Sequence, residues 1–138
     1  RCIKIDLPET VKRLTIEIFS DLHIGSKKCD MDLIKQRIER VKNDPDCYCV
    51  LLGDIINNST KSSVGDVYSE PLSPMAQIKT AIDLFRPIAG KVIGGTAGNH
   101  ERRSYKQDGI DLLYFMFTEL VIADRSFIAP RYCLYALV

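Results

Sequence analysis

The chain has 138 residues, of which 46% are hydrophobic and 27% are charged, and this size and composition are typical of one globular domain with its own core. Nineteen Lys and Arg residues oppose 18 Asp and Glu residues, so the net charge of +1 excludes a domain-wide basic surface that binds nucleic acid or anionic membranes by charge alone. No apolar stretch approaches the roughly 20 residues that span a bilayer, and we expect a cytoplasmic protein without a membrane partner.

The first half of the chain predicts two strands and a helix. Apolar and polar residues alternate over residues 14–19, a period-2 pattern typical of a β-strand. Asp30 is a good helix N-cap, and apolar residues follow it at helical spacing until an Asp-Pro pair at residues 44–45 ends the helix. Residues 47–52 form a continuous apolar run, as expected of a strand buried on both faces.

The second half predicts two more helices and two more strands. Residues 57–70 are polar without a period, which predicts a loop. Ser73, followed by Pro, opens a helix that ends before a third strand at residues 91–97. Asp108 is predicted to cap a third helix, and residues 132–138 have the pattern of a fourth strand.

This alternation of strands and helices predicts an α/β fold, in which a largely parallel β-sheet is flanked by helices. We treat residues 1–138 as a single domain. In such sheets, polar sites gather at the carboxyl ends of the strands. A short polar motif directly follows each of the first three predicted strands, so side chains far apart in the sequence are expected to meet at that edge.

The three motifs carry side chains suited to a divalent metal ion. Asp21 and His23 follow the first strand two residues apart, so in an extended turn both project to one side and hold one ion. Asp54 follows the second strand and has two oxygens that can bridge two ions. After the third strand, Asn99 offers an amide oxygen, while His100 points elsewhere and is free for a non-ligand role. Mixed nitrogen and oxygen donors suit Mn, Fe or Zn.

Taken alone, each motif has a plain structural interpretation, because such residues are common in turns and helix caps. Three of them in order, each at a strand end, favour a metal site. They resemble the signature of the calcineurin-like metallophosphoesterases, which runs Asp-x-His, Gly-Asp-x-x-Asn and Gly-Asn-His-Glu. Here these blocks are residues 21–23, 53–57 and 98–101, and the resemblance covers residues 14–103.

The resemblance implies a layered metallophosphoesterase fold that binds two divalent metal ions, with Mn favoured and Fe, Zn or Mg as alternatives. It implies that Asp21 and His23 bind the first ion, that Asp54 bridges both ions, and that Asn99 binds the second. His100 would contact the substrate phosphate and protonate the leaving oxygen. The implied reaction is hydrolysis of phosphomonoesters or phosphodiesters by a hydroxide activated between the two ions.

One departure from the family pattern limits the resemblance. The family's second half supplies further histidine ligands, including a final Gly-His-x-His block, whereas this chain has two histidines in all. We therefore expect residues 1–138 to be the N-terminal part of a larger enzyme, of the small bacterial or phage type. A missing C-terminal half or self-association would then cover the sheet edge. The alternative is a catalytically incomplete family member that acts as a binding or interaction module.

A basic stretch at residues 102–106 gives an indication of the substrate class. It is either a solvated loop or a segment that steers a phosphate backbone toward the metal ions. It favours nucleotides or nucleic acid over phosphoproteins as the phosphoester substrate. The predicted loop at residues 57–70 follows the second motif and would shape substrate access.

The cysteine count is odd, and its spacing is not that of a disulfide framework or a zinc site. The pair in the second predicted strand alternates with other residues, so both thiols are expected on the same face of that strand. We expect reduced, mostly structural thiols, as in a cytosolic protein; the five cysteines are Cys2, Cys29, Cys47, Cys49 and Cys133.

Overall fold

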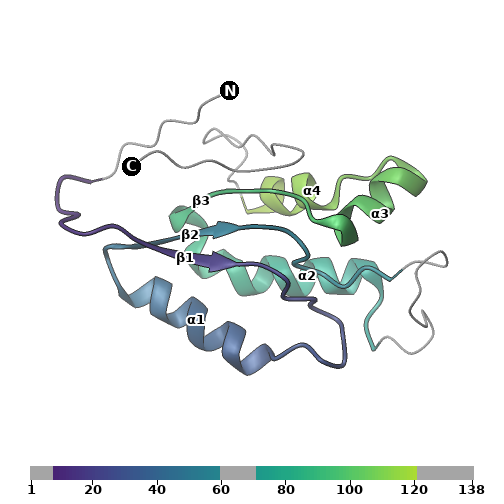
Figure 1. Ribbon diagram of the computed structural model, residues 1–138, viewed down its shortest axis with the longest axis horizontal. Coiled ribbons are helices and arrows are strands. Elements are labelled where there is room, and N and C mark those ends of the chain that lie inside the picture. The colour runs from purple at the N-terminus through teal and green to yellow at the C-terminus, as the bar shows by residue number, and fades with distance from the viewer. Residues whose placement is uncertain (1–7, 60–70, 121–138) are drawn as a thin grey trace.

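The computed structural model describes residues 8–59 and 71–120, which form a parallel three-stranded sheet with helices packed against it (Figure 1). The strands are β1 (Thr15–Phe19), β2 (Cys47–Leu51) and β3 (Val92–Gly95), in the spatial order β1-β2-β3. The predicted α/β class and the first three predicted strands are confirmed. Because all three strands run in the same direction, their carboxyl ends lie at one edge of the sheet.

The first two predicted helices begin at the predicted caps. They are α1 (Met31–Asn43) and α2 (Pro74–Phe85), and the 3-10 helix η2 (Arg86–Lys91) directly follows α2. The side chains of Asp30 and Ser73 each accept a backbone N–H from the first turn of their helix. These bonds satisfy donors that have no partner inside the helix, so both helix starts are encoded locally.

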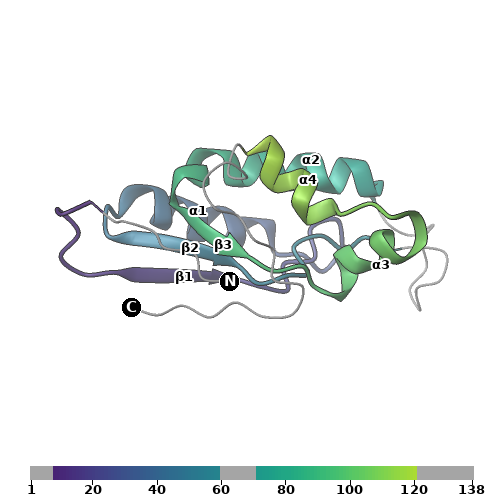
Figure 2. The same ribbon diagram turned by 90° about the horizontal axis from the view of Figure 1, so that it is seen from above.

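Three of the described helices cover one face of the sheet. Figure 2 shows α1, α2 and α4 (Leu112–Glu119) on the same side of the strands. For α1 and α2 this follows from the handedness of the connections, because right-handed crossovers between strands added in one direction lie on the same face. The core between sheet and helices includes Phe19 and Phe85, whose rings pack edge to face with centroids 5.1 Å apart.

The covered face of β1 carries a charged residue. Glu17 and Phe19 point toward the helices, whereas Ile18 is 50% exposed on the other face. The Glu17 carboxylate is buried and forms an ion pair with the guanidinium of Arg37 on α1. That partner offsets the cost of removing the carboxylate from water. The alternating pattern therefore identified the strand but not which of its faces is covered.

Two expectations about residues 99–111 are wrong. Residues 99–108 were expected as a turn and a loop, but they form the helix α3 (Asn99–Asp108), and Asp108 is its last residue. The next helix, α4, is capped by Asp111, whose side chain accepts a backbone N–H from its first turn. The helix α3 has no apolar stripe, because Glu101 is its one buried residue, so hydrophobic periodicity carried no helical signal there.

Some expectations fall on residues that the structure does not describe. These are the predicted fourth strand at residues 132–138 and residues 60–70 of the predicted loop. Within the two described ranges, no helix combines the length and the apolar character needed to cross a bilayer. The cysteines in those ranges are free thiols, as expected, and the two in β2 are fully buried; the described cysteines are Cys29, Cys47 and Cys49.

Candidate metal centre

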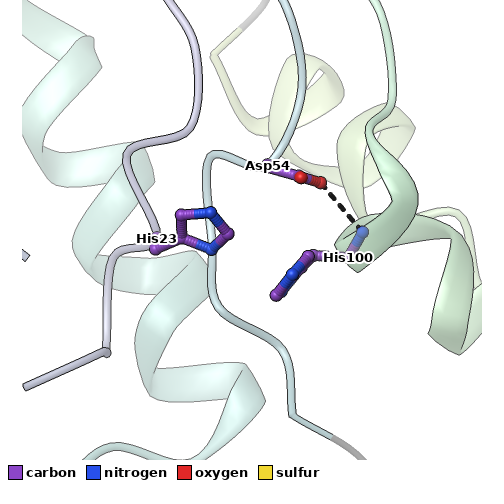
Figure 3. Close-up of side chains that lie close together, drawn as sticks. All are labelled: His23, Asp54 and His100. Carbon is purple, nitrogen blue, oxygen red and sulfur yellow. Dashed lines mark hydrogen bonds between the residues drawn. The ribbon is translucent and has the colours of Figure 1, made fainter. Parts of the chain in front are cut away.

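Three side chains meet at the carboxyl edge of the sheet. His23 comes from the segment after β1, Asp54 from the segment after β2, and His100 from the first turn of α3 (Figure 3). Each offers one ligand atom, and these atoms all lie within 4.8 Å of one another. The two imidazole rings have centroids 4.4 Å apart and are inclined at 75°. This clustering of residues from three distant motifs was expected from the strand order.

The segments after β1 and β2 are tied together by their backbones. Asp21 N–H donates to the carbonyl of Gly53 at 3.1 Å, and His23 N–H donates to the carbonyl of Asp54 at 2.9 Å. Asp21, His23 and Asp54 have φ angles of 54°, 48° and 51°. The left-handed region is unfavourable for residues with side chains, and such strain concentrates at functional sites. The expected extended turn at Asp21 and His23 is therefore wrong, although the two side chains still lie near each other.

A buried carboxylate joins the segment after β2 to the start of α3. Glu101 is 2% exposed, and its oxygens accept N–H groups from Asp54 at 3.0 Å, Ile56 at 3.2 Å and Gly98 at 2.9 Å. Asp54 Oδ1 in turn accepts the N–H of His100 at 2.9 Å. Sequence reasoning gave Glu101 no role. Its position three residues after Gly98 was the available signal, since a glutamate at that place bonds back to the residue before the helix.

Gly98 has no room for a side chain. A Cβ atom at this position would lie 2.1 Å from Asp54 Oδ1 and 2.4 Å from the Asp54 backbone nitrogen. The same approach is visible from the other side, because a Cβ on Gly53 would lie 2.5 Å from the Gly98 nitrogen. The two glycines thus let the second and third motifs pack backbone against backbone.

His100 is held by neighbours on both ring nitrogens. Its Nδ1 contacts the carbonyl oxygen of Asn57, and because a carbonyl only accepts, this contact places a proton on Nδ1. Two nitrogens of the Arg103 guanidinium lie 3.1 Å from Nδ1 and from Nε2. The buried side chain of Asn58 donates to the His100 carbonyl at 2.7 Å. The imidazole therefore has a defined orientation at the site.

The donor set fits a divalent metal ion. His23 Nδ1 is buried and, among the described residues, has no hydrogen-bond partner. Leaving a buried polar atom unpaired is costly, and a bound cation would satisfy it. Two imidazoles and a carboxylate are also the mixed donors that first-row divalent metals prefer.

Asp21, expected as a ligand, lies outside this cluster. The Asp21 side chain is 71% exposed, and its Oδ1 is 3.9 Å from His23 Nε2. Asn99, also expected as a ligand, is exposed beside His100 at the first position of α3. His100, which was expected to point away from the ligands, is instead a member of the cluster.

A hollow of about 520 Å³ opens beside the cluster. It is lined by Asp21, His23 and Asn57 from the site and by residues of α1 and the segment before it, including Lys28 and Arg37. Its volume lies within the range of small-molecule sites in proteins.

Comparison of the chain with protein-family models, with curated proteins and with solved structures finds no match.

Proposed function

We propose that the chain carries the metal site of a phosphoesterase, built as in the calcineurin-like metallophosphoesterases that its motifs resemble. The observation that carries this proposal is the meeting of His23, Asp54 and His100, with one ligand atom from each within 4.8 Å of the others. The buried, unpaired Nδ1 of His23 supports it. The proposed reaction is the hydrolysis of phosphomonoesters or phosphodiesters, including those of nucleotides or nucleic acid.

Each motif has a proposed role in binding two divalent ions, for which Mn is favoured. His23, with Asp21 beside it, would hold one ion, Asp54 would contact both, and Asn99 would hold the other. When bound, such ions activate the attacking water and neutralise charge on the phosphoryl group. The bond from His100 N–H to Asp54 Oδ1 holds the carboxylate that would bind the ions in place.

His100 is proposed to act on the substrate through Nε2. The Asn57 carbonyl holds Nδ1, so Nε2, which the Arg103 guanidinium also contacts, is the nitrogen proposed to meet a phosphoryl oxygen or the leaving oxygen. Replacing His100 with Gln should therefore lower turnover more than it lowers metal content. An equal loss of both would make His100 a metal ligand.

The test is metal content and hydrolysis of bis(p-nitrophenyl) phosphate after reconstitution with Mn²⁺. Bound Mn²⁺ together with turnover that a chelator abolishes would support the proposal. Because further ligands are expected beyond these motifs, the measurement is made on this chain and on any longer form of the protein. Absence of metal binding from both forms would refute it.

The second candidate function is a metal-binding interaction module without hydrolysis. The observation that favours it is that both histidines of the chain belong to one three-residue cluster, a donor set that one ion suffices to fill. Stoichiometric metal without turnover in either form would support the module, whereas two ions per chain with turnover would support the enzyme.

A further inference from the structure

Arg103 is a cation at the candidate site whose charge no described residue neutralises. It lies on α3 one turn after His100 and is half-buried. Its guanidinium contacts the His100 ring at 3.1 Å and the carbonyl oxygens of Asn57 and Asn58 at 3.4 and 3.5 Å. All these partners are uncharged acceptors or an imidazole. Within residues 8–59 and 71–120, no carboxylate lies within ion-pair distance of Arg103.

Arg37 on α1 provides the contrast. Its side chain is also half-buried, but its guanidinium pairs with the buried carboxylate of Glu17. A guanidinium is always charged and presents a planar fork of donors that matches two oxygens of a carboxylate or phosphate. The Arg103 fork lies against the ring nitrogens of His100 and makes long bonds to two carbonyls, so among the described residues its partners carry no formal negative charge.

We infer that Arg103 binds the phosphoryl group of the ligand at this site, through its guanidinium and two non-bridging oxygens. The inference rests on the proposed function, because it assigns a residue to the substrate of that same site. It defines the ligand class as a phosphate ester whose phosphoryl group sits between Arg103 and the cluster of His23, Asp54 and His100.

The experiment measures the affinity of the Mn²⁺-reconstituted chain for inorganic phosphate by calorimetry, with Mn²⁺ affinity measured separately. Arg103→Met should weaken phosphate binding roughly 10- to 100-fold, the usual effect of removing a charged hydrogen-bond donor, without lowering Mn²⁺ affinity. Arg103→Lys keeps the charge but loses the planar fork of donors. Its phosphate affinity should therefore lie between that of the unmodified chain and that of Arg103→Met.

The matched control is Lys79→Met, which removes the same charge from an exposed position on α2, outside the candidate site and the basic stretch. It should leave phosphate affinity within about twofold of the unmodified chain, as expected for a solvent-screened charge. Equal affinities in the Arg103→Met and Lys79→Met variants would overturn the inference, and so would an unmodified chain that binds no phosphate.

Three further outcomes are distinguishable. A parallel loss of Mn²⁺ and phosphate affinity in Arg103→Met would mean that Arg103 only positions His100, which overturns the inference. Weaker binding of an oligodeoxynucleotide with unchanged phosphate binding would place Arg103 on the nucleic-acid backbone outside the site, which also overturns it. Phosphate binding that depends on Arg103 without any hydrolysis would support the inference while the phosphoesterase proposal fails.

Discussion

The two sides of the candidate site are held in different ways. On one side, backbone hydrogen bonds join Asp21 and His23 to the segment after β2, and the Asp21 side chain is 71% exposed. On the other side, Asp54 and His100 are locked together by a direct bond and by the carboxylate of Glu101, which is 2% exposed. One side is thus shaped by backbone conformation, and the other by a buried polar network.

This difference predicts how strongly the site depends on each of these residues. A fully satisfied buried network is rigid, and removing one member leaves several polar groups unpaired. An exposed carboxylate can be lost with little structural consequence, because water replaces its contacts. We therefore expect changes at Asp54 and Glu101 to have larger effects than the same changes at Asp21.

The largest expected effect is that of Asp54→Asn. The amide oxygen can still accept the N–H of His100, so the fold is retained, but the negative charge and the second ligand oxygen are lost. Mn²⁺ affinity should fall at least roughly 100-fold. Asp21→Asn is the matched change on the exposed side and should cost only about 3- to 10-fold. Similar losses in the two variants would mean that the site does not depend on the buried side more than on the exposed one.

Glu101→Gln should come next. The amide has a single acceptor oxygen, and its NH₂ group would face backbone N–H donors, so at least one of three buried donors loses its partner. We expect a loss of about 2–3 kcal/mol in the free energy of unfolding, measured by urea denaturation. The control is Glu39→Gln on α1, where the exposed pair with Lys42 should contribute no more than about 0.5 kcal/mol. A Glu101→Gln variant as stable as its control would show that the network does not stabilise the fold.

Gly98→Ala should have an effect of similar size on stability, but one directed at the site. The new Cβ would overlap Asp54 Oδ1 and its backbone nitrogen, and relief of the overlap should cost about 1–3 kcal/mol and displace Asp54. Gly109→Ala is the control, because its φ of 70° adds backbone strain while its surroundings are open. Both variants should lose stability, but Gly98→Ala alone should lose Mn²⁺ affinity. If both lost it equally, general destabilisation would be the cause.

The last expected effect lies in the core, away from the site, and arises only at alkaline pH. Burial, followed by the neighbouring Cys47 and Glu17, raises the pKa of the Cys49 thiol to about 12 from 9.0. Above pH 9 the unfolded chain loses this proton while the folded chain keeps it, so the stabilisation is complete below pH 9 and is lost between pH 9 and 12. Cys49→Ala should therefore flatten the decline of stability over that range, by up to about 1.4 kcal/mol per pH unit. An unchanged slope in urea titrations would contradict this assignment.

The sequence by itself determined the features that depend on near neighbours in the chain. The three strands follow from short apolar runs, and α1 and α2 follow from an apolar stripe behind Asp30 or Ser73. The placement of Asp54 and the two histidines at one edge also followed, because parallel strands end together. These predictions held because the signals lie within a few residues of the elements they specify.

Only the tertiary structure decided how the site is assembled. The helix α3 has no apolar stripe, and Glu101 in its first turn bonds to backbone groups more than 40 residues away. That helix turns His100 into the cluster and brings Arg103 beside it. The left-handed backbone at His23 and Asp54 likewise accompanies bonds between separate segments. A buried charge and strained dihedrals are stabilised by partners distant in the chain, and the local pattern records only the bond of Glu101 to Gly98.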